Sequence, residues 1–178
     1  MENPCLTFLT PGLLAGDRSL TAIVAHEIAH SWTGNLVGCT TWEHFWLNEG
    51  FTRFLEAKIL EKKFGKTWAD FEAIEGLTRL RDSIKAFENR PLLTALVPDL
   101  TGIDPDDSFS RVPYEKGRNL LKLVEQKLGV GRYHYIIKHL YILYFHIVFL
   151  GWNGKPELDI FNFNTFKRRS FGSCSAST

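Results

Sequence analysis

The sequence predicts a mainly α-helical protein. The stretch 49–64 is amphipathic, Gly65 is placed to stop that helix, and Thr67 to cap the next one. A long proline- and aspartate-containing segment, residues 89–112, reads as a loop. The expected helices cover residues 20–36, 49–64, 68–88, 114–128 and 133–150, and residues 5–10 are expected to form a short edge strand near the N-terminus.

The first predicted helix carries the most informative motif. Ser19 is the expected N-cap, and the helix is expected to end before Gly38. Residues 26–30 read His-Glu-Ile-Ala-His, so His26 and His30 lie four positions apart on one face of the helix. This spacing allows the two imidazoles to hold one metal ion between them.

Glu27 is the expected proton carrier of this motif. It lies about 100° round the helix from His26, beside the ion rather than pointing at it. Zinc held by two neutral imidazoles and one carboxylate keeps a positive charge and an open position, which lowers the pKa of bound water to about 7. A neighbouring carboxylate then completes the deprotonation. The motif therefore predicts a zinc hydrolase site with one Zn²⁺ per chain.

The third metal ligand is expected from the second helix. Glu49, in the sequence Asn-Glu-Gly-Phe, follows His30 after eighteen intervening residues, and Thr40 and Thr41 indicate a loop between the two helices. A lone histidine on an apolar helix is more often a structural or surface residue, which is the alternative interpretation. The combination of the histidine pair with Glu49 favours zinc binding over that alternative.

The motifs of this chain resemble those of a known enzyme family. Residues 1–8, 14–20, 26–35, 42–52 and 112–117 are similar to the zinc aminopeptidases related to leukotriene A4 hydrolase and aminopeptidase B. The resemblance implies a thermolysin-like zinc metallopeptidase catalytic domain, truncated at both ends. A partial peptidase domain is then expected over residues 1–131, followed by a divergent C-terminal helix and tail over residues 132–178.

The resemblance also implies roles for further residues. Glu2 would hold the free α-ammonium of the substrate, and Tyr114 would donate a hydrogen bond to the oxyanion. Asp106 corresponds to an acidic residue near the substrate side chain. Glu56, two turns after Glu49 on the same face, would orient a zinc-bound histidine from behind.

Each of these residues also has a purely structural interpretation. Taken alone, Glu2 is a solvated acidic residue near a chain end, and Tyr114 is a half-buried tyrosine at a helix start. Glu56 could instead form a surface ion pair with Lys63 or Arg53.

Two functions of different kinds follow from these residues. The first is a zinc-dependent aminopeptidase that removes N-terminal residues from peptides, with the bifunctional leukotriene A4 hydrolase type as one form of it. The second is a truncated, non-catalytic zinc-binding product that associates with a full-length relative, for example through the apolar residues 140–150. A chain that does not fold alone is a third alternative.

Composition limits the remaining classes. A formal net charge of +1 argues against electrostatic capture of nucleic acid. Cys5, Cys39 and Cys174 are odd in number and widely spaced, which indicates free thiols in a reducing compartment and predicts a cytoplasmic location without a signal peptide. The apolar residues 140–152 fall short of the roughly 20 residues needed to span a membrane.

Overall fold

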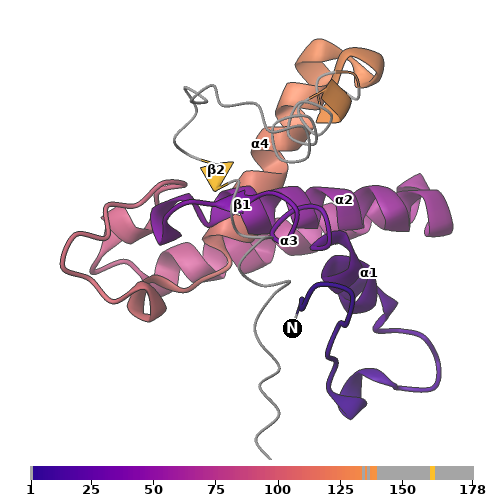
Figure 1. Cartoon of the computed structure of the whole chain (residues 1–178), viewed down its shortest axis with the longest axis horizontal. Helices are drawn as coiled ribbons and strands as arrows, with labels where there is room; N and C mark the ends of the chain where they lie inside the picture. Colours follow the sequence, from indigo (N-terminus) through magenta and orange to yellow (C-terminus); the bar gives the residue numbers. More distant parts are fainter. Residues whose placement is uncertain (1, 134, 136, 140–160, 163–178) are drawn as a thin grey trace, which may run out of the picture.

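The computed structural model describes residues 2–133, 135, 137–139 and 161–162, and it confirms the mainly helical prediction (Figure 1). In this part of the chain the α-helices are α1 (Thr21–Ala29), α2 (Trp46–Phe64), α3 (Lys66–Ala86) and α4 (Val112–Leu128). The short 3-10 helices are η1 (Pro11–Leu13), η2 (Trp42–His44), η3 (Pro91–Thr94) and η4 (Pro105–Ser108).

The first helix is shorter than the sequence predicts, so the prediction through residue 36 was wrong. α1 ends at Ala29, and His30 is its C-cap. The Thr33 hydroxyl donates back to the Ala29 carbonyl, and Gly34 adopts φ 140°. Because this backbone conformation favours glycine and leaves the helical region, the chain turns here instead of continuing the helix. The turn therefore makes the second histidine of the motif the cap at the end of the helix.

Two predicted helix caps were also wrong. α1 begins after Leu20, and the Ser19 N–H donates to the Asp17 carboxylate at 2.8 Å, so Ser19 lies one position too early to be the N-cap. Gly65, with φ 89°, ends α2 as predicted but is also the N-cap of α3, which places Thr67 inside the first turn. Pro113 allows α4 to start at Val112, since proline fits the first helical turn.

The strand predicted near the N-terminus is absent from the described residues. Cys5 has φ 62° and ends a turn in which the Leu6 N–H donates to the Asn3 carbonyl, and this turn interrupts the extended run. Instead, β1 (Gly38–Cys39) pairs antiparallel with β2 (Phe161–Asn162). The segment predicted as a loop, residues 89–112, contains η3 and η4 and is free of α-helix up to its last residue, Val112, where α4 begins. Most of the helix predicted over residues 133–150 lies outside the described residues.

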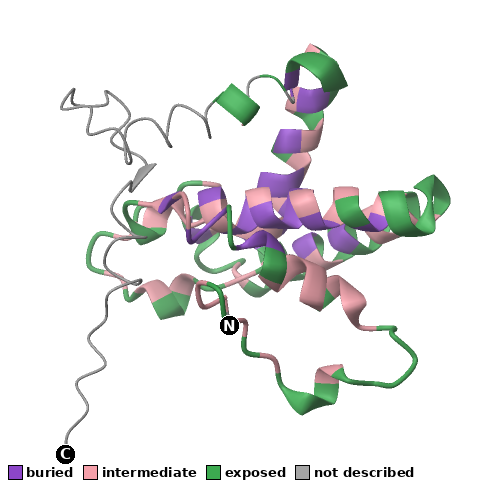
Figure 2. Cartoon of the chain, turned by 45° about the vertical axis from the view of Figure 1, so that its right-hand side comes forward, coloured by how far each residue is buried: buried purple, intermediate pink, exposed green. Residues whose placement is uncertain are grey.

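α2 is the central element of the packing. It contacts α1, α3 and α4, and α4 runs across it at a steep angle (Figure 1). Buried residues gather where these helices meet (Figure 2). Phe54 of α2, Leu121 of α4 and Tyr133 form one buried hydrophobic cluster. The arrangement fixes the N-terminal halves of α2 and α4, which carry the residues predicted to form the site.

Two glycines permit the crossing of α2 and α4. A Cβ atom on Gly50 would lie 2.8 Å from the Cα of Gly117, and one on Gly117 would lie 2.7 Å from the Cα of Gly50. Real Cβ atoms do not approach backbone this closely, so either side chain would force the helices apart. Glu49 precedes one glycine and Tyr114 lies one turn before the other, so the contact also sets the separation of these two residues.

We expect Gly117→Ala to destabilise the protein by about 1–3 kcal/mol, the usual cost of overpacking a tight interior. Gly131→Ala is the matched control, because a Cβ there meets nothing within 4 Å. That control should be neutral or stabilising by up to about 1 kcal/mol, since alanine favours helix. Urea unfolding of the three proteins measures both values, and equal stabilities of the two variants would show that the glycine contact is not tight.

Candidate metal centre and active site

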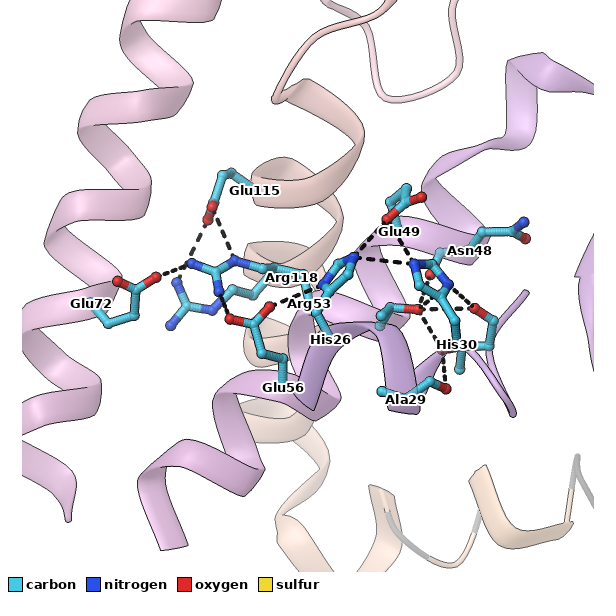
Figure 3. Close-up of polar contacts among 12 residues, drawn as sticks. His26, Ala29, His30, Asn48, Glu49, Arg53, Glu56, Glu72, Glu115 and Arg118 are labelled. Atoms are coloured by element: carbon cyan, nitrogen blue, oxygen red, sulfur yellow. Dashed lines mark hydrogen bonds and ion pairs between the residues drawn. The ribbon is translucent and has the colours of Figure 1, made fainter. Parts of the chain in front are cut away.

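The three predicted metal ligands meet at one point between α1 and α2 (Figure 3). The Nε2 atoms of His26 and His30 are 3.1 Å apart, and the Glu49 Oε2 atom lies 3.2 Å from the first and 3.4 Å from the second. Ligands about 2.0–2.1 Å from a tetrahedral zinc ion lie roughly 3.3 Å from one another. The three separations therefore suit a small tetrahedral cation.

The outer ring nitrogens decide which atoms face the centre. His30 Nδ1 lies 2.9 Å from the Thr33 carbonyl, which only accepts hydrogen bonds, so this nitrogen carries the proton. His26 Nδ1 lies 3.0 Å from the Glu56 carboxylate and donates in the same way. In the neutral imidazoles both Nε2 atoms are then lone pairs, directed at each other and at Glu49. With both imidazoles neutral, three electron-rich atoms this close need a proton or a metal cation between them, and the donor set fits zinc.

Thr52 is a supporting residue that the sequence did not reveal. It is fully buried on α2, and its hydroxyl lies 3.1 Å from His30 Nδ1, 2.9 Å from the Thr33 carbonyl and 2.7 Å from the Asn48 carbonyl. These contacts tie the turn after His30 to α2. Its position three residues after Glu49, one helical turn along, is the signal that could have found it.

The charges around His26 depend on the proton or metal at the centre. Burial lowers the pKa of His26, but the carboxylates of Glu49 and Glu56 outweigh burial and raise the pKa to about 9. For Glu49, burial raises the pKa, and hydrogen bonds from His26 and His30 lower it further than burial raises it. The metal-free site therefore binds a proton below pH 9, and a metal ion has to displace that proton.

This competition predicts a pH dependence of zinc binding. Zinc affinity should fall by about tenfold for each pH unit below pH 9, because each bound ion releases the His26 proton. Above that pH the His26 contribution disappears and the affinity levels off. Competition with a chelator of known pH dependence, from pH 6.5 to 9.5, measures the slope. A zinc affinity independent of pH over this range would show that His26 holds no proton there and would contradict its raised pKa.

Tyr114 lies directly beside the metal ligands. Its ring stacks on the His26 imidazole with centroids 6.0 Å apart and an interplanar angle of 23°. Burial raises the pKa of the Tyr114 phenol well above its usual range, and Glu49 adds to this while Arg111 opposes it. Glu2 and Glu27 act on the same phenol in the same direction as Glu49. The phenol is therefore a hydrogen-bond donor at neutral pH.

Glu2 and Asp106 line a common cavity of about 330 Å³. Asn35 donates a hydrogen bond to the Glu2 carbonyl at 2.5 Å, so the turn after His30 also holds the N-terminal segment. Asp106 is exposed on η4. Phe45 and Phe109 connect the cavity to the metal ligands, because both line it and both lie edge-on to the Tyr114 ring. The rest of the wall includes the apolar and aromatic side chains of Trp42, Trp46, Leu93, Leu96, Pro105 and Pro113.

Glu56 makes two contacts that the sequence offered as alternatives, one to a predicted metal-binding histidine and one to a basic side chain. One carboxylate oxygen accepts from His26 Nδ1 and the other from Arg53, rather than from Lys63. Glu56 is 3% exposed, so the ion pair is buried and not at the surface. The structure thus brings Glu56 to the metal ligands from the side opposite Glu49.

Comparison with known proteins shows the family of this chain. The helical fold, in which the two histidines of an H-E-x-x-H pattern converge with Glu49 of the next helix, is the arrangement typical of zinc metallopeptidases. The family described as the peptidase family M1 domain matches residues 1–148. The chain belongs to this family.

Its relatives carry two related names. The chain is 55% identical over 129 residues to a leukotriene A-4 hydrolase of Xenopus laevis, covering 72% of this chain and 21% of that protein. It is 43% identical over 178 residues to a leukotriene A-4 hydrolase homolog of Botryotinia fuckeliana, covering 100% of this chain and 26% of that protein. It is 46% identical over 163 residues to a leucine aminopeptidase 2 of Emericella nidulans, covering 92% of this chain and 25% of the relative.

Solved structures show the same likeness in three dimensions. A structure of yeast LTA4 hydrolase in complex with bestatin matches with a TM-score of 0.76 and 46% identity over 79% of this chain and 23% of that one. The chain therefore spans about a quarter of the length of the proteins it resembles. Within the described residues, none of the helices is both long and apolar enough to cross a membrane.

Proposed function

We propose that this chain acts as a zinc-dependent aminopeptidase, with His26, His30 and Glu49 holding the ion. The observation that carries the proposal is the convergence of three donor atoms, two of them on imidazoles whose outer ring nitrogens are held by hydrogen bonds. Zinc bound in such a site supplies a Lewis acid that activates water and polarises a peptide carbonyl. Membership of the M1 family supports the same chemistry.

Glu27 is the proposed carrier of protons. It follows His26 on α1, is half-buried, and lies close enough to Tyr114 for its charge to act on the phenol. A carboxylate in this position accepts the proton of the attacking water and returns it to the leaving amine. Tyr114, protonated and next to His26, donates a hydrogen bond to the carbonyl oxygen as negative charge develops there.

The cavity is the proposed place for the N-terminal end of the substrate. A free peptide N-terminus is a cation, and the Glu2 carboxylate offers it a charge-assisted hydrogen bond. The apolar wall around Trp42 and Phe45 suits an apolar side chain, with Asp106 at the edge. The same apolar wall supports a lipid as a second substrate, in line with the name of the leukotriene A-4 hydrolase relatives.

The exposed face of α3 supports the second candidate, a non-catalytic zinc-binding product that associates with a full-length relative. Phe71, Ile74 and Leu77 share one face of this helix and are 65%, 65% and 41% exposed. Exposed apolar faces of this kind are typical of interaction surfaces. Free thiols at Cys5 and Cys39 support the proposed cytoplasmic location of either product.

Removal of the substrate's positive charge or of the metal tests the aminopeptidase. The purified chain should hydrolyse leucine arylamide and should lose this activity on the N-acetylated substrate, whose N-terminus is neutral. A chelator should abolish hydrolysis and added zinc should restore it. Hydrolysis of both substrates at similar rates would exclude an aminopeptidase, and zinc binding without any hydrolysis would favour the non-catalytic candidate.

A further inference from the structure

Arg53 is the centre of a buried charge cluster beside the metal ligands. It lies one turn after Glu49 on α2 and is 7% exposed. Its three guanidinium nitrogens contact three carboxylates from three helices: NH1 contacts Glu56 of α2, NH2 contacts Glu72 of α3, and Nε lies 3.2 Å from Glu115 of α4 (Figure 3). Two arms of the guanidinium therefore tie α3 and α4 to α2, and the third holds Glu56 on α2 itself.

Two of these carboxylates lead to the site. The Glu56 oxygen that Arg53 does not contact accepts from His26 Nδ1 at 3.0 Å, so Glu56 cannot rotate without losing one of its two partners. Glu115 follows Tyr114 in the first turn of α4. Gly76 of α3 leaves the space that the Glu115 carboxylate fills, since a Cβ there would collide with it. Arg53 is thus connected to the metal ligand on one side and to Tyr114 on the other.

Stability alone does not account for this arrangement. The desolvation of a buried ion pair largely offsets its attraction, and apolar residues of similar volume are often as stable. A planar guanidinium does offer a fixed geometry, with donors at set angles to several carboxylates, which a flexible ammonium does not reproduce. The arrangement therefore favours an orienting role.

We propose that Arg53 is a positioning residue that fixes Glu56 against His26 and the first turn of α4, with Tyr114, against the metal centre. The inference rests on the proposed zinc site. Partners that orient a metal-bound histidine from behind commonly change metal affinity by about 10–100-fold. Arg53 acts one step further out, through Glu56.

Arg53→Lys tests the proposal, because it keeps the charge and the stem but removes the fork. Zinc affinity should fall by about 10-fold or more, and the visible spectrum of the cobalt-substituted chain should change as the ligand geometry relaxes. Arg79→Lys is the matched control, because Arg79 belongs to the same cluster and binds Glu72 at 2.6 Å, Glu75 at 3.5 Å and Glu115 at 3.9 Å. The control should keep zinc affinity within about twofold, the scatter of independent sites.

A double variant tests the route of the effect. If Arg53 acts through Glu56, then Arg53→Lys combined with Glu56→Gln should bind zinc about as weakly as Glu56→Gln alone. The reason is that Glu56→Gln already removes the carboxylate through which Arg53 acts on His26. Additive losses in the double variant would overturn the route through Glu56. A simple loss of fold stability would not produce this non-additivity or the cobalt spectrum.

Each remaining outcome decides the proposal or its basis. Wild type without zinc binding contradicts the proposed function itself. If wild type binds zinc and Arg53→Lys binds it with the same affinity, the role of Arg53 is overturned while the zinc site stands. The same holds if Arg79→Lys loses as much zinc affinity as Arg53→Lys does. If circular dichroism shows that Arg53→Lys does not fold, Glu72→Met replaces it as the test, because it releases one arm of the same guanidinium. Zinc affinity should then fall by at least about threefold, the lower end of the coupling between groups in one network. Unchanged affinity in that variant overturns the proposal.

Discussion

Glu49→Ala is expected to remove zinc from the protein. Glu49 is the anionic donor of the site, 3.2 Å and 3.4 Å from the two imidazole nitrogens, and it is 5% exposed. Without Glu49, the two remaining ligands are neutral imidazoles, and the charge of a divalent ion in a largely buried site has no anionic ligand to balance it. Zinc affinity should fall by more than about 100-fold, beyond the loss that outer partners cause. Metal analysis after gel filtration in zinc-free buffer measures the loss.

Glu61→Ala is the control for this experiment. Glu61 lies on the same helix, twelve residues after Glu49, is half-buried, and has Lys58 as an ion-pair partner at 4.0 Å. The control should bind zinc as wild type does. Zinc retained by Glu49→Ala at the wild-type level would remove Glu49 from the ligand set.

Glu27→Gln is expected to separate zinc binding from hydrolysis. Glutamine has the size of glutamate but cannot accept a proton at neutral pH, so the metal centre should survive while proton transfer fails. Hydrolysis of leucine arylamide should fall by about 10²–10⁴-fold, the usual contribution of a positioned general base. Zinc content should stay at the wild-type level, because the three converging donors belong to His26, His30 and Glu49.

Glu43→Gln controls for the loss of any acidic residue near the cavity. Glu43 lines the cavity and accepts from the Leu100 N–H at 3.1 Å, which an amide oxygen can also do. Its activity should remain near wild type. Undiminished hydrolysis by Glu27→Gln would assign proton transfer to another group, and zinc loss in that variant would make its activity uninformative about the proton.

The residues that the sequence predicted best are those whose roles depend on spacing along a helix. His26 and His30 are four positions apart, so one helix already brings their side chains together, and Glu49 joins them because it lies at the start of a helix that packs on the first one. The helix over residues 49–64 was predicted for the same reason, and the structure only extends it to Trp46.

The features that the sequence did not predict depend on contacts between distant segments. The end of α1 at Ala29 follows from Gly34 and from the Thr33 hydroxyl, which the apolar pattern through residue 36 conceals. The meeting of Arg53 with Glu72 and Glu115 joins residues 19 and 62 positions apart. No local pattern encodes such a meeting, and it becomes visible only once α3 and α4 are packed on α2.

X-ray absorption at the zinc edge of the zinc-loaded chain tests the central claim most directly. We expect a four-coordinate ion with nitrogen and oxygen donors at about 2.0–2.2 Å and multiple scattering from two imidazoles. A sulfur donor at about 2.3 Å would point to a cysteine such as Cys39 instead. That result, or a spectrum without two imidazoles, would contradict a zinc centre built from His26, His30 and Glu49.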